Sequence, residues 1–189
     1  MIRPPVAFAR DLPRALALAA MGSLLAATPA AHAEPTGVGP TGFTVSFHHE
    51  LKAPPAQAFE QVGHVERWWN AEHSWSGNAA NLSMGLQAGN CFWERWAGGS
   101  VEHGRVIMVM KDSLVRIDAA LGPLQGLAVK GILTIALKPL DGGRTAMDVT
   151  YRVSGGSPDA GLEKLAPAVD GVIGEQAARL ARLVDTGRP

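Results

Sequence analysis

Residues 90–110 have the sequence NCFWERWAGGSVEHGRVIMVM, two runs rich in aromatic and β-branched residues around a pair of glycines. This pattern predicts a tight β-hairpin with Gly98 and Gly99 as its two-residue turn. Counting back from that turn places Glu94 opposite His103. Because side chains alternate along a strand, the same face should also carry four neighbours: Phe92, Trp96, Val101 and Arg105. The hairpin is therefore expected to present a carboxylate, an imidazole and a guanidinium among apolar groups.

The remaining periodicity predicts an α+β fold. Alternating apolar and polar residues indicate five further strands, at 43–51, 79–84, 113–119, 127–139 and 145–153. Two short helices, at 56–62 and 65–70, follow the first strand. After Ser157 and Pro158, apolar residues recur at spacings of three and four up to Val184, the pattern of a long amphipathic helix. We therefore expect a seven-stranded antiparallel sheet wrapped around a long C-terminal helix.

Composition narrows the classes of function. Lys and Arg number 17 and Asp and Glu number 17, so no basic field is available to attract nucleic acid. The single cysteine, Cys91, excludes an internal disulfide and a cysteine-based zinc site.

The first 33 residues are expected to be a targeting segment. Arg3, Arg10 and Arg14 precede an apolar run at 15–27, and Ala31-His32-Ala33 fits the small-x-small cleavage rule. The run is shorter than the roughly 20 residues that a transmembrane helix needs. We therefore expect a signal peptide at 1–33 cleaved after Ala33, a flexible lead at 34–42 and a domain at 43–186. The mature protein would be periplasmic or secreted, without stable membrane insertion.

Several short motifs resemble one known superfamily. They are WW at 68–69, HSWSG at 73–77, GNCF at 89–92, HGRV at 103–106, LGPL at 121–124 and VDGV at 169–172. Together, over residues 43–184, they resemble the START-like, or SRPBCC, superfamily in a polyketide cyclase/dehydrase-like, uncharacterised branch with a signal peptide. The resemblance implies a helix-grip fold with a deep hydrophobic cavity. Members of the superfamily include lipid and hormone carriers and polyketide cyclases.

The candidate ligand-binding residues are those expected to face the cavity or to roof it: Trp69, His73, Trp75, Phe92, Glu94, Trp96, His103, Arg105 and Tyr151. Glu94 and His103 are also catalytic candidates, because a carboxylate beside an imidazole fixes its tautomer and raises its basicity. The same pair could instead be a structural ion pair or a polar anchor for a ligand. His73, Glu94 and His103 lack the spacing of a zinc site, so no metal and no cofactor is expected.

Two functions follow as hypotheses. The first is binding of a small hydrophobic or aromatic molecule in a cavity whose expected wall is Phe92, Trp96, Ile107, Leu133, Ile135 and Tyr151. The second is a cyclase- or dehydratase-type enzyme that uses Glu94 and His103 as an acid–base pair. A partner-binding module with an exposed tryptophan patch is a third, weaker interpretation, and the sequence leaves the ligand and the oligomeric state open.

Overall fold

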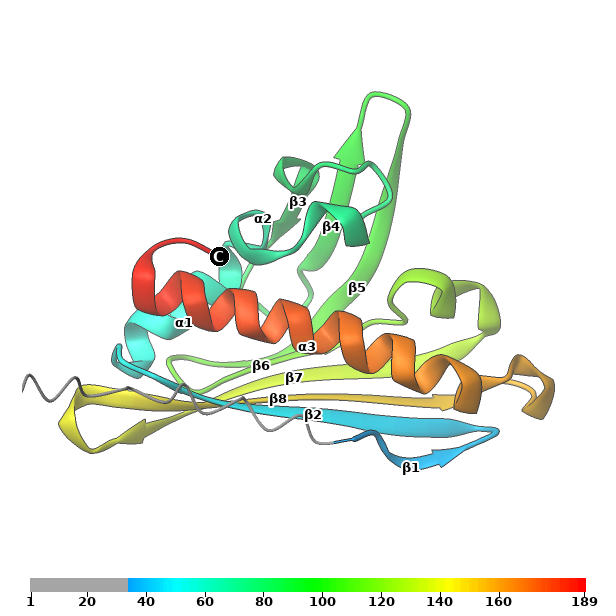
Figure 1. Cartoon of the computed structure of the whole chain (residues 1–189). Coiled ribbons are helices and arrows are strands. Elements are labelled where there is room, and N and C mark those ends of the chain that lie inside the picture. The colour runs from blue at the N-terminus through cyan, green and yellow to red at the C-terminus, as the bar shows by residue number, and fades with distance from the viewer. Residues whose placement is uncertain (1–33) are drawn as a thin grey trace, which may run out of the picture. The chain divides into compact units, whose positions relative to one another are not determined.

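The computed structural model describes residues 34–189, so the expected signal peptide at 1–33 lies outside the described residues. These residues build one antiparallel sheet of eight strands in the order β1-β2-β8-β7-β6-β5-β4-β3. The strands are β1 (Thr36–Gly39), β2 (Gly42–Leu51), β3 (Leu82–Met84), β4 (Cys91–Trp96), β5 (Gly99–Met110), β6 (Leu114–Asp118), β7 (Val129–Leu140) and β8 (Arg144–Gly155). The long helix α3 (Leu162–Thr186) lies along one face of this sheet, and β3 to β5 rise beside it (Figure 1).

The expected α+β class and its antiparallel sheet are confirmed, with one strand more than the seven expected. The additional strand, β1, occupies part of the segment expected to be a flexible lead, where Thr36 pairs with Thr44 of β2. Its four residues are mostly exposed, so no buried apolar periodicity marks it in the sequence.

Short helices connect β2 to β3. Helix α1 (Pro55–Gly63) has proline in its first turn, where no backbone N–H is needed, and buries Ala58 and Val62. Helix α2 (Val65–Trp68) follows, then two 3₁₀ turns, η1 (Ala71–His73) and η2 (Ala79–Asn81). The other 3₁₀ turns are η3 (Gly122–Leu127), η4 (Asp141–Gly143) and η5 (Pro158–Ala160).

Helix α3 buries the apolar stripe that the sequence predicts. Its buried residues include Leu162, Ala166, Ile173, Ala177, Leu180, Leu183 and Val184. The helix begins later than expected, because Ser157 caps the separate turn η5 and Gly161 adopts a left-handed conformation with φ 66°. No helix within residues 34–189 combines the length and hydropathy needed to cross a membrane.

The predicted register of the central hairpin is wrong. Trp96 pairs with Gly99, so the turn residues are Ala97 and Gly98, and Glu94 pairs with Val101 rather than His103. A Cβ on Gly99 would lie 2.9 Å from the Trp96 ring, so the missing side chain makes room for that ring at the turn. The expected pair of Phe92 with Arg105 is replaced by Phe92 with Gly104, and Cys91 pairs with Arg105.

A β-bulge at His103 changes which residues of β5 face inward beyond it. Trp93 pairs with Glu102 while Phe92 pairs with Gly104, so β5 carries one extra residue, His103, at this point. His103 and Gly104 are consecutive buried residues, and the alternation beyond them is reversed. Arg105, expected to face inward, therefore lies on the exposed side.

Candidate functional site

A cavity of about 280 Å³ lies between the first half of α3, the turn η3 and the loop that follows α2. Its wall is mainly apolar and consists of Trp69, His73, Ser74, Trp75, His103, Leu121, Gly122, Pro123, Leu124, Tyr151, Leu165, Ala168, Val169, Val172 and Ile173. An apolar cavity of roughly 150 Å³ already accepts benzene. This cavity is therefore large enough for a molecule of one or two rings.

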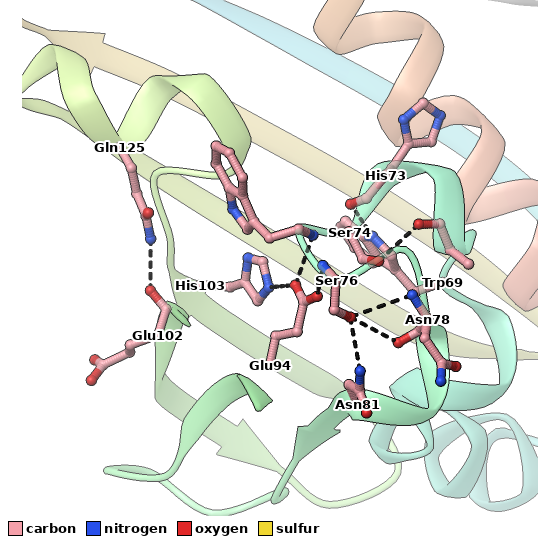
Figure 2. Close-up of polar contacts among 12 residues, drawn as sticks. Trp69, His73, Ser74, Ser76, Asn78, Asn81, Glu94, Glu102, His103 and Gln125 are labelled. Carbon is pink, nitrogen blue, oxygen red and sulfur yellow. Dashed lines mark hydrogen bonds and ion pairs between the residues drawn. The ribbon is translucent and has the colours of Figure 1, made fainter. Parts of the chain in front are cut away.

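Glu94 lies behind the cavity wall and is fully buried on β4. Its Oε2 accepts hydrogen bonds from the Trp75 backbone N–H at 3.0 Å and from His103 Nε2 at 2.9 Å. Its Oε1 accepts a short hydrogen bond, 2.5 Å, from the Ser76 backbone N–H. Figure 2 shows the carboxylate between the imidazole and the loop that carries Ser76. One carboxylate thus joins β4, the β5 bulge and the roof of the cavity.

These hydrogen bonds keep Glu94 ionised. Burial alone would raise the pKa of Glu94, but hydrogen bonds from Ser76, Trp75 and His103 outweigh burial and lower it below 4.5. A carboxylate has no proton to donate. The proton between the two side chains therefore belongs to Nε2 of His103.

His103 is held as a neutral imidazole with its proton on Nε2. Burial lowers the pKa of His103 below 6.5, against the opposing effect of Glu94. The Phe92 ring packs against the imidazole, with ring centroids 4.8 Å apart. Within residues 34–189, Nδ1 has no hydrogen-bond partner, and His103 lines the cavity. The arrangement presents a lone pair, on Nδ1, as a hydrogen-bond acceptor in a mainly apolar wall.

The roof of the cavity is the loop from Asn70 to Ser76. Helix α3 holds its beginning: Gln176 Oε1 accepts from the Asn70 backbone N–H at 2.7 Å, and Glu175 Oε1 accepts from Asn70 Nδ2 at 2.6 Å. The other Glu175 oxygen lies 3.0 Å from His73 Nε2. The roof is therefore anchored on one side by α3 and on the other by Glu94.

The donors of two other cavity-lining side chains are used within the protein. Trp69 Nε1 donates to the His73 carbonyl at 3.0 Å, and the Ser74 hydroxyl donates to the Ala71 carbonyl at 2.8 Å. These two hydrogen bonds stabilise the conformation of the roof, so neither donor is available to a ligand.

Tyr151 supports the opposite wall. Its hydroxyl donates to the Ala119 carbonyl at 2.8 Å and accepts from the Leu121 N–H at 3.1 Å. Burial raises the pKa of Tyr151 to about 12, so the phenol stays neutral. The hydroxyl thus fixes the chain just before η3, which supplies Pro123 and Leu124 to the cavity.

The structure brings together five of the nine predicted ligand-binding residues around the cavity: Trp69, His73, Trp75, His103 and Tyr151. Glu94 and Phe92 lie behind His103 and support it. Trp96 does not line the cavity, and Arg105 is exposed and bonded to Glu102 at 2.8 Å. His73 points toward α3 and away from Glu94 (Figure 2), so the three side chains considered for a metal do not converge.

The expected cavity wall needs correction. Ile107 is 46% exposed. Leu133 and Ile135 line only a separate void of about 10 Å³ beneath Trp68, Ile173 and Leu180. The central part of α3 thus packs closely on the sheet, and the hollow opens toward the first half of the helix. The contributions of η3 and α3 to the wall were not expected, although LGPL at 121–124 and VDGV at 169–172 are among the motifs that resemble the superfamily.

No protein-family model and no curated protein sequence matches this chain. Solved structures do match. The norcoclaurine synthase structure from Thalictrum flavum is 12% identical, with a TM-score of 0.57, and the match covers 82% of this chain and 97% of that one. The Aha1 dimer from Colwellia psychrerythraea is 13% identical, with a TM-score of 0.55, and the match covers 77% and 98%.

CalU16 from Micromonospora echinospora is 13% identical, with a TM-score of 0.54, and the match covers 78% of this chain and 77% of that one. These similarities concern the arrangement of the sheet and its long helix, because the identities are too low to carry over an activity. By its architecture and its structural neighbours, this chain has the helix-grip fold.

Proposed function

We propose that this protein binds a small hydrophobic or aromatic molecule in the cavity between the sheet and α3. The observation that carries the proposal is the cavity of about 280 Å³, whose mainly apolar wall includes His103 with no hydrogen-bond partner at Nδ1 among residues 34–189. Ligand cavities commonly combine an apolar wall with a few placed polar groups.

Native mass spectrometry of gently purified protein tests this proposal, and a co-purified small molecule is expected. A titration with naphthalene, followed by tryptophan fluorescence, provides a second test because Trp69 and Trp75 line the cavity. Val172→Phe, which adds a ring to the cavity wall, should abolish the fluorescence change. Val38→Phe makes the same exchange on exposed β1 and should leave it unchanged. If no co-purified mass is found and naphthalene does not bind saturably, the proposal is wrong.

Acid–base catalysis is a second candidate, favoured by the contact between Glu94 and His103 Nε2 at 2.9 Å. Glu94 orients the imidazole so that Nδ1 can accept a proton from a bound carbon acid and return it. The catalytic step would be removal of a proton next to a carbonyl group, which gives an enolate and an imidazolium.

Deuterium exchange at the acidic carbon of an aromatic β-diketone measures that step. Wild-type protein should accelerate exchange, and His103→Ala should abolish the acceleration while its melting temperature stays within a few degrees. If wild-type protein gives no acceleration, binding remains as the proposed function. If His103→Ala unfolds the protein, the pair has a structural role.

We also propose that the chain is exported and cleaved after Ala33. The support is the arginine-bearing start, the apolar run at 15–27 and the Ala31-His32-Ala33 sequence. N-terminal sequencing of the protein recovered from cells that express the full chain should begin at Glu34. A retained Met1 would contradict export by this route.

A further inference from the structure

Most side-chain donors around the cavity are already used within the protein, and the exception among the described lining residues is the indole N–H of the exposed Trp75. Hydrogen bonds within the protein use the donors of Tyr151, Trp69 and Ser74. His73, at the cavity mouth, uses its Nε2 on Glu175. A ligand with only acceptor groups would therefore find no free donor among these four side chains.

Unlike these donors, one hydrogen-bond acceptor at the cavity wall, Nδ1 of His103, has no partner within residues 34–189. Glu94 takes the Nε2 proton of His103 as its hydrogen-bond partner, and this leaves the lone pair of Nδ1 available at the cavity wall. The His103 side chain is only 5% exposed, but Nδ1 is not fully buried, so water in the cavity can reach it when no ligand is bound. A bound ligand that displaces this water would leave the acceptor unpaired unless it brings an N–H or O–H group of its own.

The charges around the cavity select against an anionic ligand. Among the described residues that line the cavity, none is lysine or arginine. Arg105, which was expected to meet a ligand carboxylate, is bonded to Glu102 on the outer face instead. The ionised Glu94 carboxylate lies directly behind His103, so its charge would repel a ligand carboxylate at Nδ1.

We infer that the ligand is an uncharged apolar molecule with one hydrogen-bond donor, a phenol or an aromatic N–H, directed at Nδ1 of His103. This inference rests on the proposed binding function and specifies the ligand class for the same cavity. Trp69 and Trp75 supply ring surfaces for the body of such a molecule, and His103 recognises its donor group. The hydrogen bond should contribute roughly three- to tenfold to affinity.

Three naphthalene derivatives of similar size test the inference by isothermal titration calorimetry on the full-length protein. 2-Naphthol carries a donor, 2-methoxynaphthalene carries only an acceptor, and 2-naphthoate carries a negative charge. We expect 2-naphthol to bind at least about threefold more tightly than the methyl ether, and naphthoate to bind most weakly. Equal binding of naphthol and its ether, or tightest binding of naphthoate, would overturn the inference and leave the binding function intact. Absence of binding by all three would overturn both.

Two substitutions of His103 separate its two nitrogens. His103→Gln places an amide N–H near the position of Nε2, so it keeps a donor toward Glu94 and removes the acceptor at Nδ1. His103→Asn places an amide oxygen near Nδ1 and loses the donor toward Glu94. The preference for naphthol over its ether should disappear in His103→Gln and persist in His103→Asn. Retention of the full preference in a folded His103→Gln would overturn the inference.

Nitrogen NMR of wild-type protein gives a measurement that does not depend on the variants folding. Long-range proton–nitrogen correlation spectra should show a protonated Nε2 and an unprotonated Nδ1 for His103. Added 2-naphthol should shift the Nδ1 resonance, and 2-methoxynaphthalene should not shift it in the same way. A proton on Nδ1 in the free protein would contradict the inferred donor preference.

Discussion

The Glu94 carboxylate and the His103 imidazole meet at 2.9 Å although the hairpin does not pair these residues with each other. Glu94 is paired with Val101, and His103 lies two residues further along β5 on the same face. The contact therefore joins diagonal neighbours on one face of the hairpin rather than a directly opposite pair.

Replacing Glu94 by Gln should loosen the roof of the cavity. The amide has one donor group where the carboxylate accepts from Trp75, Ser76 and His103, so at least one of these donors loses its partner. We expect a loss of roughly 1–3 kcal/mol in the free energy of unfolding and faster hydrogen exchange of the Trp75 and Ser76 amides. Mass-spectrometric or NMR hydrogen exchange measures both amides.

The matched control is Glu102→Gln in the same hairpin. Glu102 forms an exposed ion pair with Arg105, so its loss should cost less than about 1 kcal/mol and leave the roof amides unchanged. If Glu94→Gln behaved like this control, Glu94 would not anchor the roof.

The stability of the protein should fall as pH decreases, in two ranges. The pKa of His103 is lower in the folded protein than its ordinary 6.5, so the unfolded chain takes up the proton first. The stability that comes from keeping His103 neutral is therefore fully present above pH 6.5. It decreases as pH falls from 6.5 toward the pKa of His103 in the folded protein. The lowered pKa of Glu94 acts in the same direction, from pH 4.5 downward.

Urea unfolding at a series of pH values measures this dependence. Subtracting the stability-versus-pH curve of His103→Gln from that of wild-type protein isolates the range due to His103, because the variant has no titrating group at this position. A difference curve that is flat between pH 7 and pH 5 would contradict a neutral, buried His103.

Tyr151 gives a separate test of the cavity wall. It is the single tyrosine of the chain, so absorbance at alkaline pH reports this one phenol. Because burial raises its pKa to about 12, the phenolate band should appear only near that pH or with alkaline unfolding. Tyr151→Phe should remove the band and cost roughly 1–3 kcal/mol, since the Leu121 N–H and Ala119 C=O lose their partner. A titration midpoint near the ordinary value of about 10 would mean that the hydroxyl reaches water.

Gly104 should not tolerate a side chain. A Cβ at this position would lie 2.6 Å from the Asp118 carbonyl oxygen and 2.9 Å from Ala119 Cα, both on backbone that cannot rotate away. Gly104→Ala should therefore destabilise the protein by roughly 1–3 kcal/mol in urea unfolding and disturb the adjacent His103. Gly126→Ala is the control, because a Cβ added there would have nothing within 4 Å and the φ of Gly126 is not positive. Equal stability of the two variants would refute close packing at the bulge.

The sequence predicted those elements whose local pattern agrees with their final environment. Residues 43–51 alternate because β2 buries one face, and the stripe that ends at Val184 repeats at helical spacing because α3 buries one side. The α+β class follows from such patterns alone. The motif resemblance added the helix-grip arrangement, which the structure confirms.

The hairpin register could not be predicted in the same way, because tertiary contacts determine it. Two glycines in sequence favour a turn at Gly98-Gly99, but the Trp96 ring occupies the space beside Gly99 and moves the turn back by one residue. The close approach of Gly104 to β6 is also invisible along the chain. His103 was still expected on the correct face, whereas Arg105, beyond the bulge, was assigned to the wrong one.

The extra residue at His103 has a consequence for comparing this protein with distant homologues. A relative without the bulge would need one residue fewer between the hairpin turn and the segment beside β6. An ungapped alignment anchored at the turn would then match the wrong residue to Arg105 and to everything after it. Equivalent histidines in such relatives are better identified by superposing their backbones than by counting positions.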